Sequence, residues 1–394
     1  MELKFNNKLS EKAILKKAEK IKTINIDFNN ESILFEGDNF EALSLLLKNY
    51  KNKIDLIYID PPFNTDQEFF VSNDGRANSI SHSNNDIMAY SDKMSTEDYL
   101  EFIRERLILL RELLSEKGSI YLHIDYKIGH YIKIIMDEVF GKDNFRNDIA
   151  RIKSNPKNFY RKAYGNEKDL ILFYTKNYKE NIWNDIKVPL DENEIADRFN
   201  KIDENGRRYT TIPLHAPGET KSGPTSKPWR GIPVPKGRHW RTNPEEFDRM
   251  DELGLIEWSS TGNPRIKKYA DEHTGKKIQD IWRFKDPQNP KYPTEKNSNM
   301  LEQIILQSSN KDSYVLDCFA GSGSTLKSAQ KLERKWIGVD SSNVAINIIK
   351  TAKIGNYKFI NLSNKFQEEV YNKSYKQMSF ETYSVAEENN DYIS

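Results

Sequence analysis

Two short motifs follow apolar runs far apart in this chain, and their positions limit the folds that the chain can adopt. Asp60-Pro61-Pro62-Phe63 follows the run 54–59, and Phe319-Ala320-Gly321-Ser322-Gly323-Ser324 follows the run 314–316. Short apolar runs bounded by turn residues predict buried strands. In α/β sheets, ligands bind beyond the carboxyl ends of such strands. We therefore expect an α/β fold in which both motifs line one ligand site.

The first motif is suited to hold an exocyclic amino group of a nucleobase. Such an amine is a poor nucleophile while its lone pair is delocalised into the ring, and Asp60 with the Pro61 carbonyl can accept from both of its N–H bonds. Proline fixes φ at about −65° and has no N–H, so Pro61 and Pro62 stiffen the loop. Phe63 offers a stacking face to a base, which reaches such a pocket only when flipped out of the duplex. An ordinary turn after a strand is the alternative interpretation.

The second motif is a glycine-rich loop suited to close approach by a cofactor. Gly321 and Gly323 permit positive φ and place no side chain between backbone and ligand. A helix is expected from Ser324, which leaves free N–H groups at the loop. Asp340 follows an expected strand about twenty residues later, where an acid can bind ribose hydroxyls. A nicotinamide dehydrogenase can carry such a loop, so the second motif alone leaves the cofactor open.

In this order, the two motifs resemble those of the DNA methyltransferases that methylate amino groups with S-adenosylmethionine. A catalytic motif ahead of the cofactor loop is typical of their permuted beta group, and the modification subunits of type III restriction systems are the nearest likeness. Segments 35–43, 118–125 and 292–297 also resemble family motifs, and the resemblance extends over roughly 33–349. It implies a circularly permuted, Rossmann-like methyltransferase fold with an inserted target-recognition domain. It also implies S-adenosylmethionine as cofactor and double-stranded DNA as substrate.

The resemblance also implies the site residues. The catalytic residues would be Asp60, Pro61, Pro62 and Phe63. The cofactor-binding residues would be Asp38, Asp60, Thr294, Lys296, Asp317, Phe319, Ala320, Gly321, Ser322, Gly323, Ser324, Thr325 and Asp340. Adenine is the expected target base, because family members that modify cytosine more often begin the catalytic motif with Ser. The chain departs from the family at Asn297, Asp340 and Phe63, where Pro, Glu and Tyr are frequent.

Basic residues cluster in two stretches, although the net charge of the chain is only +1. Basic clusters attract phosphates, and Asn and Arg suit the edges of adenine and guanine. Gly, Pro and Trp between 213 and 244 indicate ordered loops rather than a solvated helix. The predicted DNA-binding residues are Lys153, Asn155, Lys157, Arg161, Arg207, Arg208, Lys221, Arg230, Arg238, Trp240 and Arg241. A solvated basic surface is the alternative.

The patterns divide the chain into five segments. They are an N-terminal helical arm (1–32), a catalytic half (33–184), a target-recognition insert (185–285), a cofactor-binding half (286–365) and a polar tail (366–394) that adds little to the core. Strands are expected at 33–35, 54–59, 119–124, 170–174, 314–316 and 336–339. A helix is expected from the cap Ser95 through Leu114. The polar stretch 66–93 is expected to be a lid or a DNA-clamping loop.

Composition excludes several other classes of protein. The single cysteine, Cys318, excludes an internal disulfide and fits a reducing prokaryotic cytoplasm, where the chain would be nucleoid-associated. No signal-peptide pattern and no run long enough to cross a bilayer are present, so no membrane is expected. The histidines lack metal-ligand spacing, so no metal is expected. A homodimer and a restriction subunit stay open as partners. A cytosine amino-methyltransferase and a non-catalytic DNA-binding module on the same fold stay open as alternative functions.

Overall fold

The computed structural model divides the chain into two compact units. It describes residues 2–21, 31–63, 68–71, 77–78, 87–91, 94–155, 162–288, 290, 292–293, 295–352, 354–362, 367–371 and 380–381. The main unit comprises Met1–Asp185 with Gln279–Ser394, and the inserted unit comprises Ile186–Ile278. The inserted unit lies within the predicted insert 185–285, but residues 279–285 belong to the main unit.

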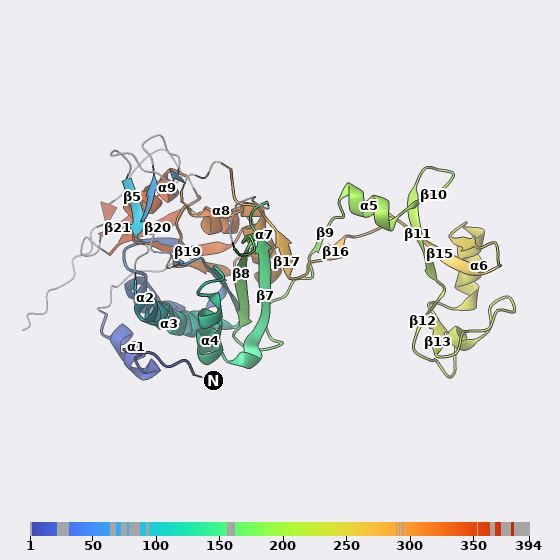
Figure 1. The fold of residues 1–394 in the computed structure, drawn as a ribbon, viewed down its shortest axis with the longest axis horizontal. Coiled ribbons are helices and arrows are strands. Elements are labelled where there is room, and N and C mark those ends of the chain that lie inside the picture. Colours follow the sequence, from blue (N-terminus) through green and yellow to red (C-terminus); the bar gives the residue numbers. More distant parts are fainter. Residues whose placement is uncertain are drawn as a thin grey trace, which may run out of the picture. The chain divides into compact units, whose positions relative to one another are not determined.

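A mixed sheet forms the centre of the main unit (Figure 1). In the described part of the chain, its eleven strands lie in the order β17 (Ile281–Arg283), β7 (Phe145–Ile152), β8 (Lys168–Thr175), β6 (Leu114–Ile124), β2 (Ile54–Ile59), β18 (Tyr314–Asp317), β19 (Lys335–Asp340), β1 (Ser32–Glu36), β20 (Tyr357–Asn361), β21 (Gln367–Tyr371) and β22 (Phe380–Glu381). Strands β6 to β20 in this order are parallel, whereas β8 is antiparallel to β6. Every strand predicted from the sequence is present in this sheet.

Strands β2 and β18 are neighbours although they lie far apart in the sequence. Leu56 pairs with Val315, and Ile57 pairs with Leu316. All four side chains are fully buried, as expected for parallel strands that are covered on both faces. The carboxyl ends of both strands therefore lie at the same edge of the sheet, where ligands bind in such folds. This pairing brings the two sequence motifs together.

Helices cover both faces of the sheet, with α1 to α4 on one face and α7 to α9 on the other (Figure 1). Their bounds are α1 (Glu11–Glu19), α2 (Asn39–Tyr50), α3 (Thr96–Leu113), α4 (Gly129–Phe140), α7 (Ser298–Ser308), α8 (Ser324–Lys331) and α9 (Asn343–Thr351). Helix α3 begins at the predicted cap, because the Ser95 hydroxyl accepts a hydrogen bond from the Asp98 N–H at 3.2 Å. None of the helices that the structure describes is both long and apolar enough to span a lipid bilayer.

Both ends of the described chain contribute to the main unit. In the N-terminal segment, Ile14 and Ala18 of α1 are buried in the hydrophobic core, so the predicted arm packs against the body. Near the other end, β21 pairs antiparallel with β20 and β22 pairs with β21. The segment predicted to be a polar tail therefore extends the sheet, because main-chain pairing does not depend on apolar composition. The predicted lid contains β3 (Glu68–Val71), β4 (Ala77–Asn78) and β5 (Ile87–Ser91), which form a small antiparallel sheet.

The inserted unit consists of short strands and two helices. Its elements are β9 (Lys187–Val188), α5 (Glu192–Arg198), β10 (Lys201–Ile202), β11 (Arg208–Pro213), β12 (His215–Pro217), β13 (Arg238–Trp240), α6 (Pro244–Glu252), β14 (Ile256–Trp258), β15 (Pro264–Tyr269) and β16 (Lys276–Lys277). Trp229, Trp240 and Phe247 are the large side chains of its core. Trp240 is only 2% exposed and contacts Phe247 edge-on at 5.8 Å. The ring of Trp240, which was predicted to bind DNA, therefore lies in the core of the unit and not on its surface.

The glycine loop between β18 and α8 gives a first testable prediction. Gly323 has φ of 72°, and a Cβ there would lie 2.7 Å from Ile349 Cγ1 of α9. Gly323→Ala is expected to lower the free energy of unfolding by about 2–4 kcal/mol, because left-handed backbone strain and overpacking both contribute. Chemical denaturation measures the change. Ile349→Ala removes the clashing atom, so the double variant should be destabilised by less than the sum of the two single variants. Strictly additive destabilisation would contradict the clash.

Candidate functional site

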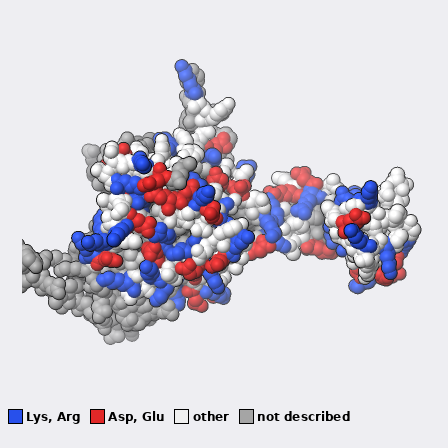
Figure 2. All heavy atoms as spheres, turned by 90° about the horizontal axis from the view of Figure 1, so that it is seen from below, with Lys and Arg blue, Asp and Glu red and all other residues white. Residues whose placement is uncertain are grey.

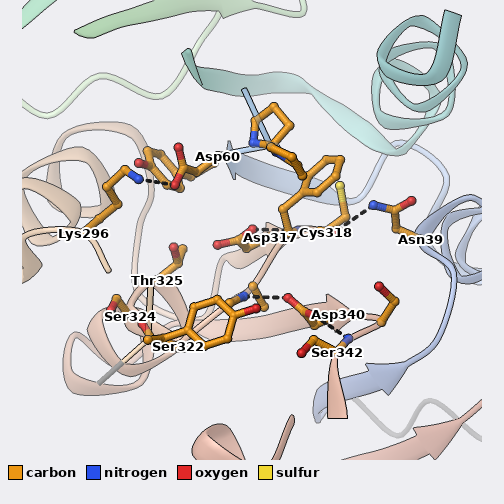
Figure 3. Close-up of a pocket in the computed structure, with 18 of the residues that line it drawn as sticks. Asn39, Asp60, Lys296, Asp317, Cys318, Ser322, Ser324, Thr325, Asp340 and Ser342 are labelled. Atoms are coloured by element: carbon orange, nitrogen blue, oxygen red, sulfur yellow. Dashed lines mark hydrogen bonds and ion pairs between the residues drawn. The ribbon is translucent and has the colours of Figure 1, made fainter. Parts of the chain in front are cut away.

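A cavity of about 320 Å³ opens at the carboxyl ends of β1, β2, β18 and β19 (Figure 3). Both sequence motifs line it, together with residues that follow β1 and β19. The lining residues are Gly37, Asp38, Asn39, Tyr58, Asp60, Pro61, Pro62, Phe63, Met94, Phe102, Tyr292, Pro293, Glu295, Lys296, Leu301, Asp317, Cys318, Phe319, Ala320, Gly321, Ser322, Ser324, Thr325, Asp340, Ser341 and Ser342. The volume lies within the range of sites for small ligands.

The Asp-Pro-Pro-Phe motif presents one open acceptor to this cavity. Asp60 Oδ1 is buried and makes no hydrogen bond with any described residue. Buried polar atoms are nearly always hydrogen-bonded, so an unpaired carboxylate oxygen facing a cavity indicates a place for a donor from a ligand. The loop behind it is held in place, because the Tyr99 hydroxyl of α3 donates to the Pro62 carbonyl at 2.6 Å. The sequence did not reveal this role of Tyr99.

Lys296 occupies the other oxygen of the same carboxylate. Its ammonium forms an ion pair with Asp60 Oδ2, as Figure 3 shows, and lies 5.6 Å from the centroid of the Phe63 ring. Lys296 is 8% exposed, so the pair is largely shielded from water. Lys296 was predicted from the resemblance to bind the cofactor. The structure places its charge beside the catalytic carboxylate, where it offsets the cost of burying Asp60.

The glycine loop is tied to Asp340 by its backbone. Gly321 N–H donates to Asp340 Oδ2 at 2.7 Å, and Ser342 N–H donates to Oδ1 at 2.8 Å. Each carboxylate oxygen retains a second lone pair, so a ligand hydroxyl can still donate to Asp340. Gly323, which was predicted to bind the cofactor, does not line the cavity. The positive φ of Gly323 and its contact with Ile349 themselves require a glycine at this position.

The cavity is rich in buried carboxylates. Burial, together with the charges of Asp60 and Asp340, raises the pKa of Asp317 to about 7, although hydrogen bonds from Thr325 and from the Phe319 N–H act in the opposite direction. Burial also raises the pKa of Asp340. Like charges in a poorly solvated site disfavour ionisation of both groups. The arrangement therefore favours a ligand that carries positive charge.

Arg106 is a part of the site that sequence reasoning missed. It lies on α3, and its guanidinium donates to Asn39 Oδ1 at 2.6 Å and to Asp38 Oδ2 at 3.2 Å. Asn39 in turn donates to the Cys318 carbonyl at 3.0 Å. This chain of contacts connects the turn after β1 to the turn after β18. No sequence signal distinguishes Arg106 from the other charged residues of α3.

The predicted DNA-binding residues fall into three groups. Lys157 and Arg161, like the predicted cofactor residue Thr294, lie outside the described residues. Lys153 pairs with the buried Asp169 at 2.6 Å, whereas Asn155 is exposed. In the inserted unit, Arg207, Arg230 and Arg241 bond to other groups of the unit, although Arg230 and Arg241 are exposed. Arg208, Lys221 and Arg238 are also exposed. Figure 2 shows basic side chains interspersed with acidic ones on both units.

No metal site is evident among the residues that the structure describes. No group of three or more His, Cys, Asp and Glu side chains among them is placed to hold an ion. The open acceptor of Asp60, the glycine loop and the carboxylates instead form one site for an organic ligand and a hydrogen-bond donor.

The chain is similar to known DNA methylases and methyltransferases. Residues 54–351 match the DNA methylase family model, which covers both motifs. The type II methyltransferase M.EcaI of Enterobacter cloacae is 39% identical over 368 residues, which cover 90% of this chain and 78% of that protein. The type III restriction-modification enzyme EcoPI Mod subunit of Escherichia phage P1 is 27% identical over 88% of this chain, and the chain spans 63% of its length. The M1.HpyAVI–SAM complex is 17% identical with a TM-score of 0.43, covering 81% of this chain and 98% of that chain.

The raised pKa of Asp317 predicts how stability depends on pH. Between pH 4 and 7 the folded state retains a proton that the unfolded state releases, so the free energy of unfolding should fall as the pH rises. In the wild type, the free energy of unfolding should decrease by up to about 4 kcal/mol over this pH range. Asp317→Asn has no such carboxyl group and should not show this decrease. Denaturant unfolding of both proteins at a series of pH values measures the difference. Parallel curves for the two proteins would contradict the prediction.

Proposed function

Because this chain belongs to the DNA methylase family, we propose that it transfers a methyl group from S-adenosylmethionine to the amino group of a flipped-out adenine in double-stranded DNA. The observation that carries the proposal is the free oxygen of Asp60 in the same cavity as the glycine loop. A dehydrogenase has no use for a carboxylate-Pro-Pro-Phe motif at this position.

The residues of the cavity fit S-adenosylmethionine. The cofactor carries a sulfonium and an ammonium group, and the cavity is lined by Asp38, Asp60, Asp317 and Asp340. Asp340 would hold the ribose hydroxyls, and Asp317 lies where it could accept from the ammonium group. Gly321 lines the cavity with a positive φ of 52°, and it places no side chain between the loop backbone and a ligand. The bound cofactor would supply an electrophilic methyl group.

The catalytic motif would act mainly by positioning the target base. Asp60 Oδ1 and the Pro61 carbonyl accept from the two N–H bonds of the adenine amino group, which draws the nitrogen toward a tetrahedral geometry and exposes its lone pair. Phe63 stacks on the base. Lys296 pairs with Oδ2 of the same carboxylate, so Oδ1 can accept from the amino group while the ion pair stays in place. Most of the rate enhancement would come from orientation and electrostatic complementarity.

Product analysis tests the proposed reaction and the role of Asp60 together. The protein is incubated with unmethylated DNA and methyl-labelled S-adenosylmethionine, and the DNA is digested to nucleosides. Label is expected in N6-methyladenine, and Asp60→Asn should lower the rate about 100-fold or more, because an amide adds a donor where an acceptor is required. Asp55→Asn is the matched control, since Asp55 lies on the same strand and bonds to Ser115 and Ser313 instead of facing the cavity.

The other outcomes of this experiment separate the alternatives. Label in N4-methylcytosine would change the proposed base but keep the reaction. Transfer that is undiminished in Asp60→Asn would contradict the role of the catalytic motif. Absence of both transfer and cofactor binding would contradict the proposed function.

The inserted unit would recognise the DNA through basic side chains that no carboxylate neutralises. Arg207 pairs with Asp271 and Glu272, and Arg230 pairs with Asp248 and Asp251, so these arginines stabilise the unit itself. Lys221 and Arg238 are exposed and are the better candidates for phosphate contacts.

A restriction subunit or a second copy of this chain would be a further partner. The likeness to type III Mod subunits makes both worth testing.

The charge pairing predicts which variants change DNA affinity. Lys221→Ala and Arg238→Ala should each weaken binding and reduce the slope of log affinity against log salt by about one, because each removes one phosphate contact. Arg207→Ala is the matched control and should leave the slope nearly unchanged. Fluorescence anisotropy with a labelled duplex at several salt concentrations measures both quantities. Equal slope changes for Arg207→Ala and Arg238→Ala would contradict the assignment.

A further inference from the structure

A buried row of polar side chains runs along the sheet from the catalytic carboxylate. His123 of β6 is 0% exposed, and its Nδ1 lies 3.9 Å from Asp60 Oδ1. The same nitrogen is hydrogen-bonded to the Tyr58 hydroxyl of β2 at 2.9 Å. The other ring nitrogen, Nε2, lies 3.4 Å from Asp169 Oδ2 of β8. His123 therefore lies between Asp60 and a second buried acid.

Asp169 is held in its ionised form by the cations around it. Lys153 Nζ lies 2.6 Å from Oδ1, and Arg151 Nη1 lies 3.6 Å from Oδ2. Burial alone would raise the pKa of Asp169, but the hydrogen bond from His123, together with the charge and the hydrogen bond of Lys153, outweighs it and holds the pKa well below its usual range. An ionised carboxylate has no proton to donate.

This ionised partner determines which nitrogen of His123 carries the proton. Because Asp169 can only accept, the proton must lie on Nε2. In the neutral ring, Nδ1 is then an acceptor and takes the hydrogen bond of the Tyr58 hydroxyl. Neither the N–H group of His123 nor the O–H group of Tyr58 is therefore directed at Asp60.

The consequence for Asp60 is that its Oδ1 stays free. With the proton on Nε2, the group opposite this oxygen is a lone pair rather than a donor. A ring protonated on Nδ1 would place an N–H there, and that N–H would compete with the substrate amino group for the same oxygen.

We propose that His123 is a positioning residue whose tautomer, set by Asp169, keeps the free oxygen of Asp60 available to the amino group of the target base. The inference rests on the proposed function for its consequence, but the tautomer is a property of the protein alone. His123 acts on the substrate only through Asp60.

The same arrangement makes the reaction sensitive to acid. The groups that face His123 are Tyr58 of β2, Asp60 directly after β2, Asp169 of β8 and Lys296 from the segment before α7. Arg151 and Lys153 act on Asp169. Burial lowers the pKa of His123 and outweighs the hydrogen bond to Asp169, so the ring is neutral at neutral pH. At lower pH, protonation of Nδ1 would place a donor opposite Asp60.

The tautomer can be observed directly in the full chain. Nitrogen-15 NMR of the histidine rings in wild-type protein, with the His123 signals assigned from a His123→Phe variant, should show a proton on Nε2 and none on Nδ1 near neutral pH. Asp169→Asn should shift the ring toward the other tautomer. A proton on Nδ1 in the wild type would overturn the proposal.

The catalytic consequence is tested by the pH dependence of kcat. Asp169→Asn should lower kcat at least about tenfold with a smaller change in KM, as expected when a histidine adopts the wrong tautomer. In His123→Phe the acid limb of the kcat profile should move to lower pH, because the ring whose protonation places a donor opposite Asp60 is then absent. His130→Gln, an exposed histidine on α4, is the control and should keep the wild-type profile.

The two experiments separate failure of the inference from failure of the proposed function. An acid limb that is identical in wild type and His123→Phe would overturn the role of His123. If the wild type transferred no methyl group to DNA, the proposed function would fail, and the NMR measurement would still decide the tautomer.

Discussion

The pairing of β2 with β18 is the interaction on which the rest of the site depends. The two strands lie far apart in the chain, and their buried apolar side chains and main-chain hydrogen bonds hold them in parallel register. Their carboxyl ends therefore meet, and the acceptor of Asp60 comes to lie in one cavity with the loop at Gly321. Neither motif forms a site alone. The order of strands in space, rather than in the chain, determines which residues meet at the edge, so a permuted chain can form the same site.

Buried charge is the second constraint on the site. Asp60, Asp317 and Asp340 share one cavity, and ionised carboxylates out of water are costly unless they are paired. Lys296 compensates Asp60 and Arg106 compensates Asp38, while Asp317 responds by a raised pKa. A ligand that carries positive charge relieves this cost when it binds. The negative charge gathered in the cavity disfavours ionisation of Asp317. The same negative charge favours binding of a sulfonium cofactor.

Local patterns in the sequence were sufficient to predict six strands of the main sheet and the cap of α3, because these features depend on neighbouring residues. Contacts between distant residues were not predictable. The ion pair of Lys296 with Asp60 and the hydrogen bond of Arg106 to Asn39 depend on how the sheet orders its strands. Trp240 lies in a basic stretch and was predicted to bind DNA. A unit as small as Ile186–Ile278 needs its largest side chains for its own core, and Trp240 is one of them.

If one cavity receives the cofactor and the target amino group together, a compound that joins the two should occupy both places. Such an analogue has the N6 atom of adenosine joined by a short linker to the methionine side of the cofactor, and titration calorimetry measures its affinity. The analogue is expected to bind more tightly than either half, and Asp60→Asn and Asp340→Asn should each weaken its binding. An affinity no greater than that of the cofactor half, or one unaffected by Asp60→Asn, would contradict a shared site.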